Sequence, residues 1–255
     1  MIINLSKESS DFLVSLRMYL VSSGKNEREI EEVIDELEDH LFEAEKNNKN
    51  VDEIIGITPK EYMEQIAGEM PIDFRGVLKT IFLICLGAFS YILMGDALTG
   101  GLSYSLIQLI GYPLILLSFL SLIVVSFKYL ASNNVSKIKE WVIFGVNGIT
   151  PLLLFLALLF FNGTYNSPTI QFGGNWNVIA IVFCILVFVG MSISGKSWIW
   201  IILPILLYVP EILINMTNIP TNTKVIIGGI GSQVCIALYL LYFFIKEKKK
   251  EKKHN

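Results

Sequence analysis

The chain has 255 residues and a formal net charge of −3, and 53% of its residues are hydrophobic. This composition, with a mean hydropathy of +0.58, is too apolar for a wholly soluble protein of this length. The small net charge hides an asymmetry. Residues 1–75 carry eight basic and 18 acidic residues, a net −10, whereas residues 76–255 carry 12 basic and five acidic residues, a net +7. The sequence therefore predicts an acidic aqueous module, residues 1–75, followed by a membrane region.

The first two helices of the module are predicted from their apolar spacing. One is expected from about Ser9 to Ser22, with Gly24 as its stop. The next begins after Asn26, a favoured N-cap with Glu29 three residues on, and ends in the Asn-rich stretch 47–50. Apolar residues of this second helix recur at three- and four-residue steps and predict its buried stripe: Ile30, Val33, Ile34, Leu37, Leu41 and Ala44.

The third helix of the module has a strong start signal. After a short turn of helix around residues 51–55, Thr58 is a natural N-cap, Pro59 suits the first helical position, and Glu61 completes a capping box. Pro71 disfavours helix in the residue before it and is expected to end this element. The module is thus predicted to be a small three-helix unit.

The remainder of the chain is dominated by apolar runs. A run of about 18 or more apolar residues is long enough to cross a hydrocarbon core of about 30 Å as a helix. Six such runs predict a six-helix membrane bundle over residues 76–245, and the fold class as a whole is all-α. The runs are Val77–Leu93, Tyr104–Phe127, Trp141–Phe161, Val178–Ser194, Trp198–Met216 and Val225–Ile245.

The lysines predict the orientation of these spans, because cytoplasmic loops are enriched in Lys and Arg. Basic residues flank the first span, separate the second from the third and the fourth from the fifth, and follow the sixth. On the other side of the predicted membrane, the connections 94–103, 162–177 and 217–224 contain a single basic residue, Lys224. Both termini are therefore expected in the cytoplasm of a multi-pass cell-membrane protein. Residues 246–255 form a Lys-rich cytosolic tail, either an ordinary positive-inside anchor or a contact to anionic lipids. No cleavable signal peptide is expected, because residues 1–30 lack an apolar core.

The module resembles a known family. Its motifs are Leu16-x-x-Tyr19-Leu20, Glu27-Arg28-Glu29, Glu36-Leu37-Glu38-Asp39-His40-Leu41, Gly56-x-Thr58-Pro59 and Gly68-Glu69-Met70-Pro71. Over about residues 10–75 they resemble the HAAS signalling domain, a cytosolic helical module fused to multi-span membrane regions and often encoded beside a PadR-type transcriptional regulator. The resemblance implies a membrane-anchored signalling protein. It carries over no ligand and no catalytic residue.

Exposed polar residues of the second helix are the candidate partner-binding site: Glu32, Glu36, Asp39, His40 and Glu43. A structural or capping role for His40 is the competing interpretation. A metal centre would need further ligands from facing helices, and the only other histidine is His254 in the tail. The sequence therefore predicts no metal, no cofactor and no catalytic set.

Glu211 is the one acidic residue well inside a predicted span, and an intramembrane carboxylate is costly enough to suggest function. Sensing of a signal, proton or ion movement, and a structural role paired with Lys224 or Asn215 all remain open. Asp96 is expected in a solvated outer loop. The stretch Gly228–Ser232 lacks the context of a phosphate-binding loop, and is expected instead to let helices approach closely.

Three function classes compete. The first is a non-enzymatic signalling protein whose module binds a protein partner, and the resemblance implies a PadR-like regulator as that partner. The acidic module fits this class, because its charge would repel nucleic acid. A transporter or transporter accessory subunit is the alternative, against which stands the scarcity of intramembrane charge. A membrane enzyme ranks last, since paired catalytic side chains are missing from the spans. The residues indicate no oligomeric state.

Overall fold

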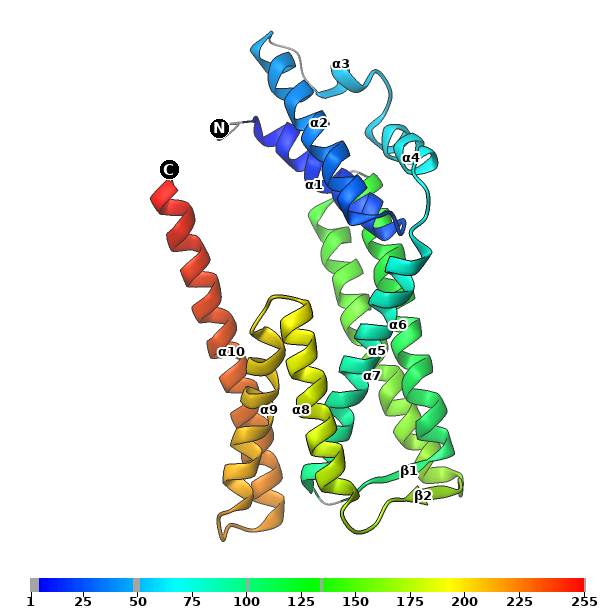
Figure 1. Cartoon of the computed structure of the whole chain (residues 1–255), viewed down its shortest axis with the longest axis vertical. Helices are drawn as coiled ribbons and strands as arrows, with labels where there is room; N and C mark the ends of the chain where they lie inside the picture. Colours follow the sequence, from blue (N-terminus) through cyan, green and yellow to red (C-terminus); the bar gives the residue numbers. More distant parts are fainter. Residues whose placement is uncertain (1–4, 48–50, 100, 134, 255) are drawn as a thin grey trace. The chain divides into compact units, whose positions relative to one another are not determined.

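A computed structural model describes residues 5–47, 51–99, 101–133 and 135–254. Within these ranges the protein is all-α, with ten helices and two three-residue strands (Figure 1). Packing divides the chain into two units. Unit 1 comprises Met1–Phe82 and Ser105–Pro168, and unit 2 comprises Leu83–Tyr104 and Thr169–Asn255. The expected division at residues 75 and 76 stays a prediction.

Unit 1 begins with four helices: α1 (Lys7–Ser22), α2 (Glu27–Lys46), α3 (Val51–Ile55) and α4 (Pro59–Glu69). They confirm the expected elements, the short α3 being the predicted turn of helix. Gly24 stops α1 with a φ of +71°, a conformation that glycine adopts at little cost. Thr58 and Glu61 form the predicted capping box of α4. Asn26 caps α2 by accepting from the Arg28 amide at 3.0 Å. Of the stretch expected to end α2, residues 48–50 lie outside the described residues.

One hydrophobic cluster holds these helices together. Its most buried members come from α1, α2 and α4, and include Leu16, Leu20, Ile30, Leu41 and Met63. The predicted stripe of α2 is confirmed at the residues that face α1: Ile30, Ile34, Leu37 and Leu41 are buried. Because burial of each large aliphatic side chain contributes about 1.5–3 kcal/mol, this cluster is the main source of stability in the module.

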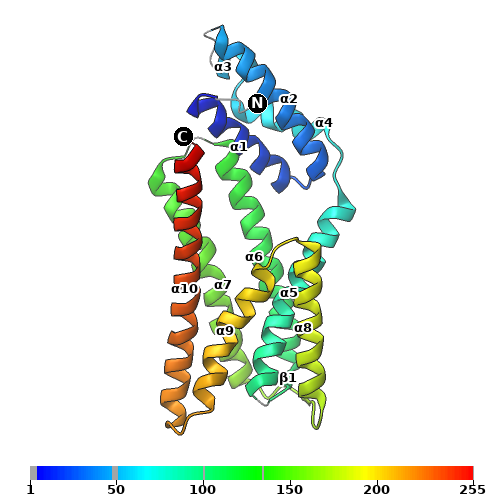
Figure 2. The ribbon, with the colours of Figure 1, turned by 60° about the vertical axis from the view of Figure 1, so that its left-hand side comes forward.

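The rest of unit 1 is an apolar helical hairpin, α6 (Leu106–Ser132) and α7 (Lys137–Thr164), joined to the first residues of α5 (Phe74–Thr99). The two hairpin helices lie side by side in both views (Figures 1 and 2). Polar contacts join the hairpin. Ser105, the N-cap of α6, is hydrogen-bonded to Asn162 of α7, and the Asn147 amide of α7 donates to the Ser126 hydroxyl of α6 at 2.8 Å. Hydrogen bonds of this kind stabilise helix pairs in an apolar solvent.

Unit 2 contains most of α5 together with α8 (Trp176–Ser194), α9 (Ile199–Asn215) and α10 (Thr221–His254). Strands β1 (Ser103–Ser105) and β2 (Thr169–Gln171) pair in a two-stranded sheet that the sequence did not predict. Helices α9 and α10 run side by side in both views (Figures 1 and 2). A Cβ at Gly228 would lie 3.5 Å from Glu211 Cα, an ordinary packing distance, so α9 and α10 are in contact at this glycine.

Each of the six predicted spans coincides with one helix. In the described part of the chain, five are long and apolar enough to cross a membrane: α5, α6, α7, α8 and residues 226–246 of α10. The remaining helix, α9, has 17 residues and falls just short. The predicted loop 94–103 is wrong over most of its length, because α5 continues to Thr99. There the Thr99 hydroxyl donates to the Gly95 carbonyl, a local bond that satisfies the helix end.

Substituting Leu37 tests the core of the module. We expect residues 1–75 expressed alone to be helical, and Leu37→Asp to lose that helix, because the new carboxylate has no partner at a site that is 6% exposed. A cost of about 3 kcal/mol or more is a large part of the stability of a small domain. Circular dichroism and thermal melting measure it, with exposed Asp35→Asn as the control. Equal melting of the Leu37→Asp fragment and the unsubstituted one would show that α2 buries another face.

Candidate functional site

The residues predicted to bind a partner lie together on the exposed side of α2. Glu32, Glu36, Asp39, His40 and Glu43, hereafter the α2 polar surface, are all exposed, whereas the opposite side of the helix packs on α1. The pattern that buries one stripe at three- and four-residue steps necessarily leaves these positions in water. The structure therefore confirms their exposure and brings them onto one helix.

Two of the four carboxylates on this surface are paired with neighbours on the same helix. Glu32 accepts from Arg28 at 3.2 Å, and Glu43 accepts from Lys46 at 2.7 Å. Exposed pairs of this kind contribute about 0–1 kcal/mol, so a partner can replace them at little cost. Glu36 and Asp39 form no ion pair within the part of the chain that the structure describes. They are the free acceptors of the surface.

The phenol of Tyr62 on α4 is close enough to the α2 polar surface to interact electrostatically with Glu36. Burial raises the pKa of Tyr62 above its ordinary value, and the negative charges of Glu36 and Glu69 act in the same direction. Tyr62 also packs against Phe12 of α1, with ring centroids 6.0 Å apart. The edge of the surface is thus joined to the hydrophobic cluster.

Two carboxylates outside the α2 polar surface tie the helices of unit 1 together. Glu45, near the end of α2, accepts the Ser6 amide at 3.0 Å and the Ser9 hydroxyl, and this hydrogen bonding lowers the pKa of Glu45. Asp73, just before α5, accepts the Gly76 amide at 2.9 Å and the Asn26 side chain at 2.9 Å. These bonds lower the pKa of Asp73. Sequence reasoning missed both ties, because their partners are distant along the chain or lie in a turn.

The N-terminal helices contact the end of the hairpin within unit 1. Helix α1 packs against α6, and Ala131 near the end of α6 belongs to the same hydrophobic cluster as Leu16 and Leu20. The Lys128 ammonium lies 5.0 Å from the centroid of the Tyr19 ring, a cation–π contact. The acidic helices are therefore docked on a membrane-type helix, rather than only tethered to one.

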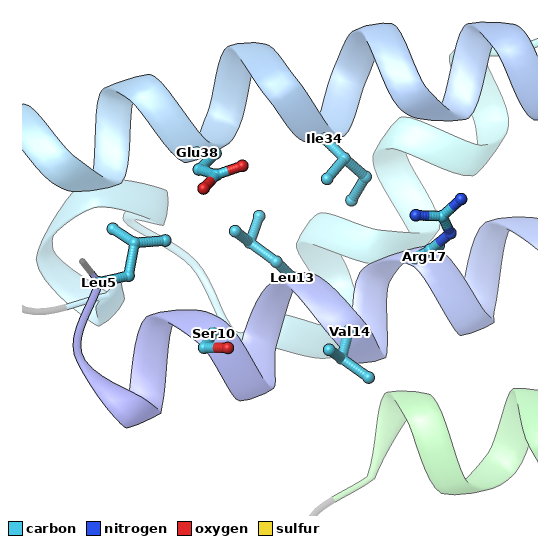
Figure 3. A pocket seen from close by; sticks show the side chains of 7 residues that line it. All are labelled: Leu5, Ser10, Leu13, Val14, Arg17, Ile34 and Glu38. Atoms are coloured by element: carbon cyan, nitrogen blue, oxygen red, sulfur yellow. The ribbon is translucent and has the colours of Figure 1, made fainter. Parts of the chain in front are cut away.

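A cleft of about 1030 Å³ lies at this junction, lined by α1, the start of α4 and the facing ends of α6 and α7. A smaller pocket of about 360 Å³ separates α1 from α2. Figure 3 shows Leu13 and Ile34 projecting between these two helices, with Leu5 at one end of the pocket, Arg17 at the other, and Glu38 projecting from α2 near Leu13. Arg17 and Glu38 both line the smaller pocket, so its lining carries both signs of charge, and Arg17 is already paired with Glu31. The larger cleft has the greater volume and joins the N-terminal helices to the hairpin.

Glu211 lies on α9 in unit 2, where it is partly buried beside Gly228 of α10. The suggested pairing with Lys224 is not formed, because the Lys224 ammonium donates to the Asn215 carbonyl at 3.0 Å. Among the described residues no cation lies within ion-pair distance of Glu211. Its sensing role stays a prediction.

Unit 2 also has polar contacts that the sequence did not reveal. Asp96, expected in a solvated loop, is instead a half-buried residue of α5 that accepts from the Tyr104 hydroxyl at 2.7 Å. The Tyr208 hydroxyl of α9 donates to the Tyr91 carbonyl of α5. An aromatic residue in an apolar run gives no signal of such a bond, since only the fold brings the acceptor near.

No group of three or more His, Cys, Asp or Glu side chains arranged to hold a metal occurs within the described ranges. The three cysteines, Cys85, Cys184 and Cys235, are all free thiols.

In the comparison with known protein families, residues 91–207 match the family described as the HAAS transmembrane region. The match confirms the predicted resemblance to a HAAS-family membrane protein over these residues. They lie in the apolar helices, whereas the resemblance rested mainly on residues 10–75. Neither the comparison with curated proteins nor the comparison with solved structures gives a match.

The lowered pKa of Glu45 predicts a pH dependence. A carboxyl whose pKa is lower in the folded state contributes stability above its unfolded pKa of about 4.3, and loses it as pH falls through the folded value. We therefore expect the residues 1–75 fragment to melt at a lower temperature at pH 3 than at pH 6, and Glu45→Gln to reduce that difference. Exposed Glu53→Gln is the control. An equal pH dependence in the Glu45→Gln and unsubstituted fragments would show that the tie contributes nothing.

Proposed function

We propose that this membrane protein, which carries a HAAS transmembrane region over residues 91–207, is a non-enzymatic signalling protein of the bacterial cell membrane. Its membrane region would sense a condition of the envelope, and its acidic N-terminal module would pass the signal to a cytosolic protein. The observation that carries the proposal is the packing of α1 on α6. A shift of the hairpin would move α1, and with it α2.

The proposed arrangement has six spans with both termini in the cytoplasm. Helix α9 would be the fifth span in chain order and would complete the set of six, since 17 residues at about 1.5 Å each reach about 26 Å, close to the thickness of a hydrocarbon core. The one-sided distribution of lysines supports this orientation. In this orientation the module and the tail of α10 would both be cytoplasmic.

The proposed contact with the partner is the α2 polar surface. Its carboxylates favour a basic protein surface and disfavour the phosphates of DNA. The partner implied by the resemblance is a PadR-like regulator. The module would then bind the regulator itself and would not bind DNA. Typical couplings between two sites are about 1–3 kcal/mol, a range that the docking of one helix can supply.

Labelling of introduced cysteines tests the orientation. In a chain whose native cysteines are replaced by alanine, we expect an impermeant maleimide applied to intact cells to label Asn166→Cys, in the loop after α7, but not Glu53→Cys, on α3. Both positions are exposed, so access to the reagent is set by the membrane. Labelling after permeabilisation is the control for reactivity. Labelling of Glu53→Cys but not Asn166→Cys in intact cells would invert the topology.

Charge neutralisation tests the partner surface. We expect the full chain to retain a cytosolic protein from native membranes, and Glu32→Gln/Glu36→Gln/Glu43→Gln to retain it at least about fivefold less, because opposite charge speeds the encounter. Retention should also fall as salt rises. The matched control, Glu27→Gln/Asp35→Asn/Glu53→Gln, removes three exposed carboxylates elsewhere. Equal retention by both variants would exclude this surface. If no cytosolic protein is retained while the chain moves a solute across vesicles, the transporter alternative replaces signalling.

A further inference from the structure

The cleft in unit 1 has an apolar floor at the place where the acidic helices meet the hairpin. Its floor combines buried side chains of α1 and α4 with exposed side chains of α6 and α7. Phe127 and Phe144 are 38% and 44% exposed, so the protein leaves part of each side chain uncovered. Apolar residues of the floor are Phe12, Met18, Met63, Phe127, Leu130 and Phe144.

Carboxylates of two helices stand at the rim of the cleft. Glu8 and Asp11 lie one turn apart on α1, and Glu140 lies in the first turn of α7. None of the three is within ion-pair distance of a cation in the residues that the structure describes. Lys60 is the one basic residue of the lining, and its ammonium lies 4.0 Å from Glu64. The rim therefore keeps a net negative charge.

We propose that this cleft binds a lipophilic organic cation, a molecule with an ammonium or similar centre on an apolar body. The apolar floor accounts for the body, and the unpaired carboxylates account for the charge. Exposed phenylalanine faces add a cation–π attraction to the same ligand. A volume of about 1030 Å³ is at the upper end for sites that bind drug-sized molecules.

The position of the cleft favours this ligand over a hydrophilic one. Helices α6 and α7 are apolar enough to span the membrane, and their cleft-lining ends adjoin polar helices. A lipophilic cation concentrates at such a boundary between membrane and water, because its body partitions into lipid and its charge does not. Lys137 and Lys139 precede Glu140 on α7, but neither lines the cleft.

Binding here would connect α1 and α4 to α6 and α7 through one ligand. A molecule that binds the docked arrangement more tightly than a separated one stabilises the docked arrangement by its differential affinity. This inference goes beyond the proposed function. Binding of the cation is measured on the full chain alone, so the result does not depend on a cytosolic partner.

The experiment uses the full chain in phosphatidylglycerol nanodiscs, with rhodamine 6G as a fluorescent lipophilic cation and empty nanodiscs subtracted. We expect saturable binding by anisotropy, displaced by tetraphenylphosphonium but not by triphenylphosphine oxide, a neutral molecule with three of the same phenyl groups. Glu8→Gln/Asp11→Asn/Glu140→Gln should weaken binding at least about tenfold. Ser15→Trp, which places a large ring in the cleft, should abolish it.

Controls separate this site from general charge effects. The variant Glu27→Gln/Asp35→Asn/Glu53→Gln has the same net charge as the cleft variant, and should bind rhodamine 6G within about twofold of the unsubstituted chain. Equal binding by the cleft variant and this control would overturn the proposal, as would equal displacement by triphenylphosphine oxide. In nanodiscs with a fixed share of phosphatidylglycerol, loss of the probe when phosphatidylethanolamine replaces phosphatidylcholine would also overturn it, since the occupant would then be a lipid amine.

Discussion

Burial of α1 is the interaction on which unit 1 depends. This helix contacts α2, α3, α4 and α6, and its Leu16 and Leu20 have no exposed surface. A module of about 70 residues buries a smaller fraction of its surface than a larger domain does, and is only marginally stable by itself. The end of α6 supplies a further wall to the core, through Ala131. Docking on a membrane-type helix is therefore part of the stability of the module, and movement of that helix has a direct path to it.

Hydrogen bonds fix the ends of the helices that the hydrophobic cluster packs together. Glu45 ties the start of α1 to the end of α2, while Asp73 ties Asn26 to the start of α5. The Lys25 ammonium also donates to the Met70 carbonyl at 2.7 Å, beside the Asp73 amide, which donates to Gly24. The turn between α1 and α2 is thus held to the segment that leads into the first apolar helix. A carboxylate in this position restricts the linker more than apolar contact would, because hydrogen bonds are directional.

The apolar helices follow a different rule, since lipid does not drive them together. Close approach at small residues and hydrogen bonds between helices must supply the attraction. In unit 2, α10 contacts Glu211 of α9 at a small residue, Gly228. In unit 1, a hydrogen bond from Asn147 to Ser126 joins α7 to α6. Glu211 is consequently held at a helix contact, where its charge has no cation from the described residues beside it. Such a group gives the sensing hypothesis a defined place to be tested.

The sequence by itself determined the helices, because their signals are local. Apolar spacing, the Thr58–Glu61 capping box, Gly24 and the long apolar runs depend only on neighbours along the chain. It also determined which residues of α2 are exposed, since one buried stripe leaves the rest in water. Only the tertiary structure decided that α1 docks on α6, that Glu45 and Asp73 are ties, and that Glu8 and Glu140 meet at one cleft. These contacts join residues far apart in the chain, and their partners are set by packing geometry, which no local pattern encodes.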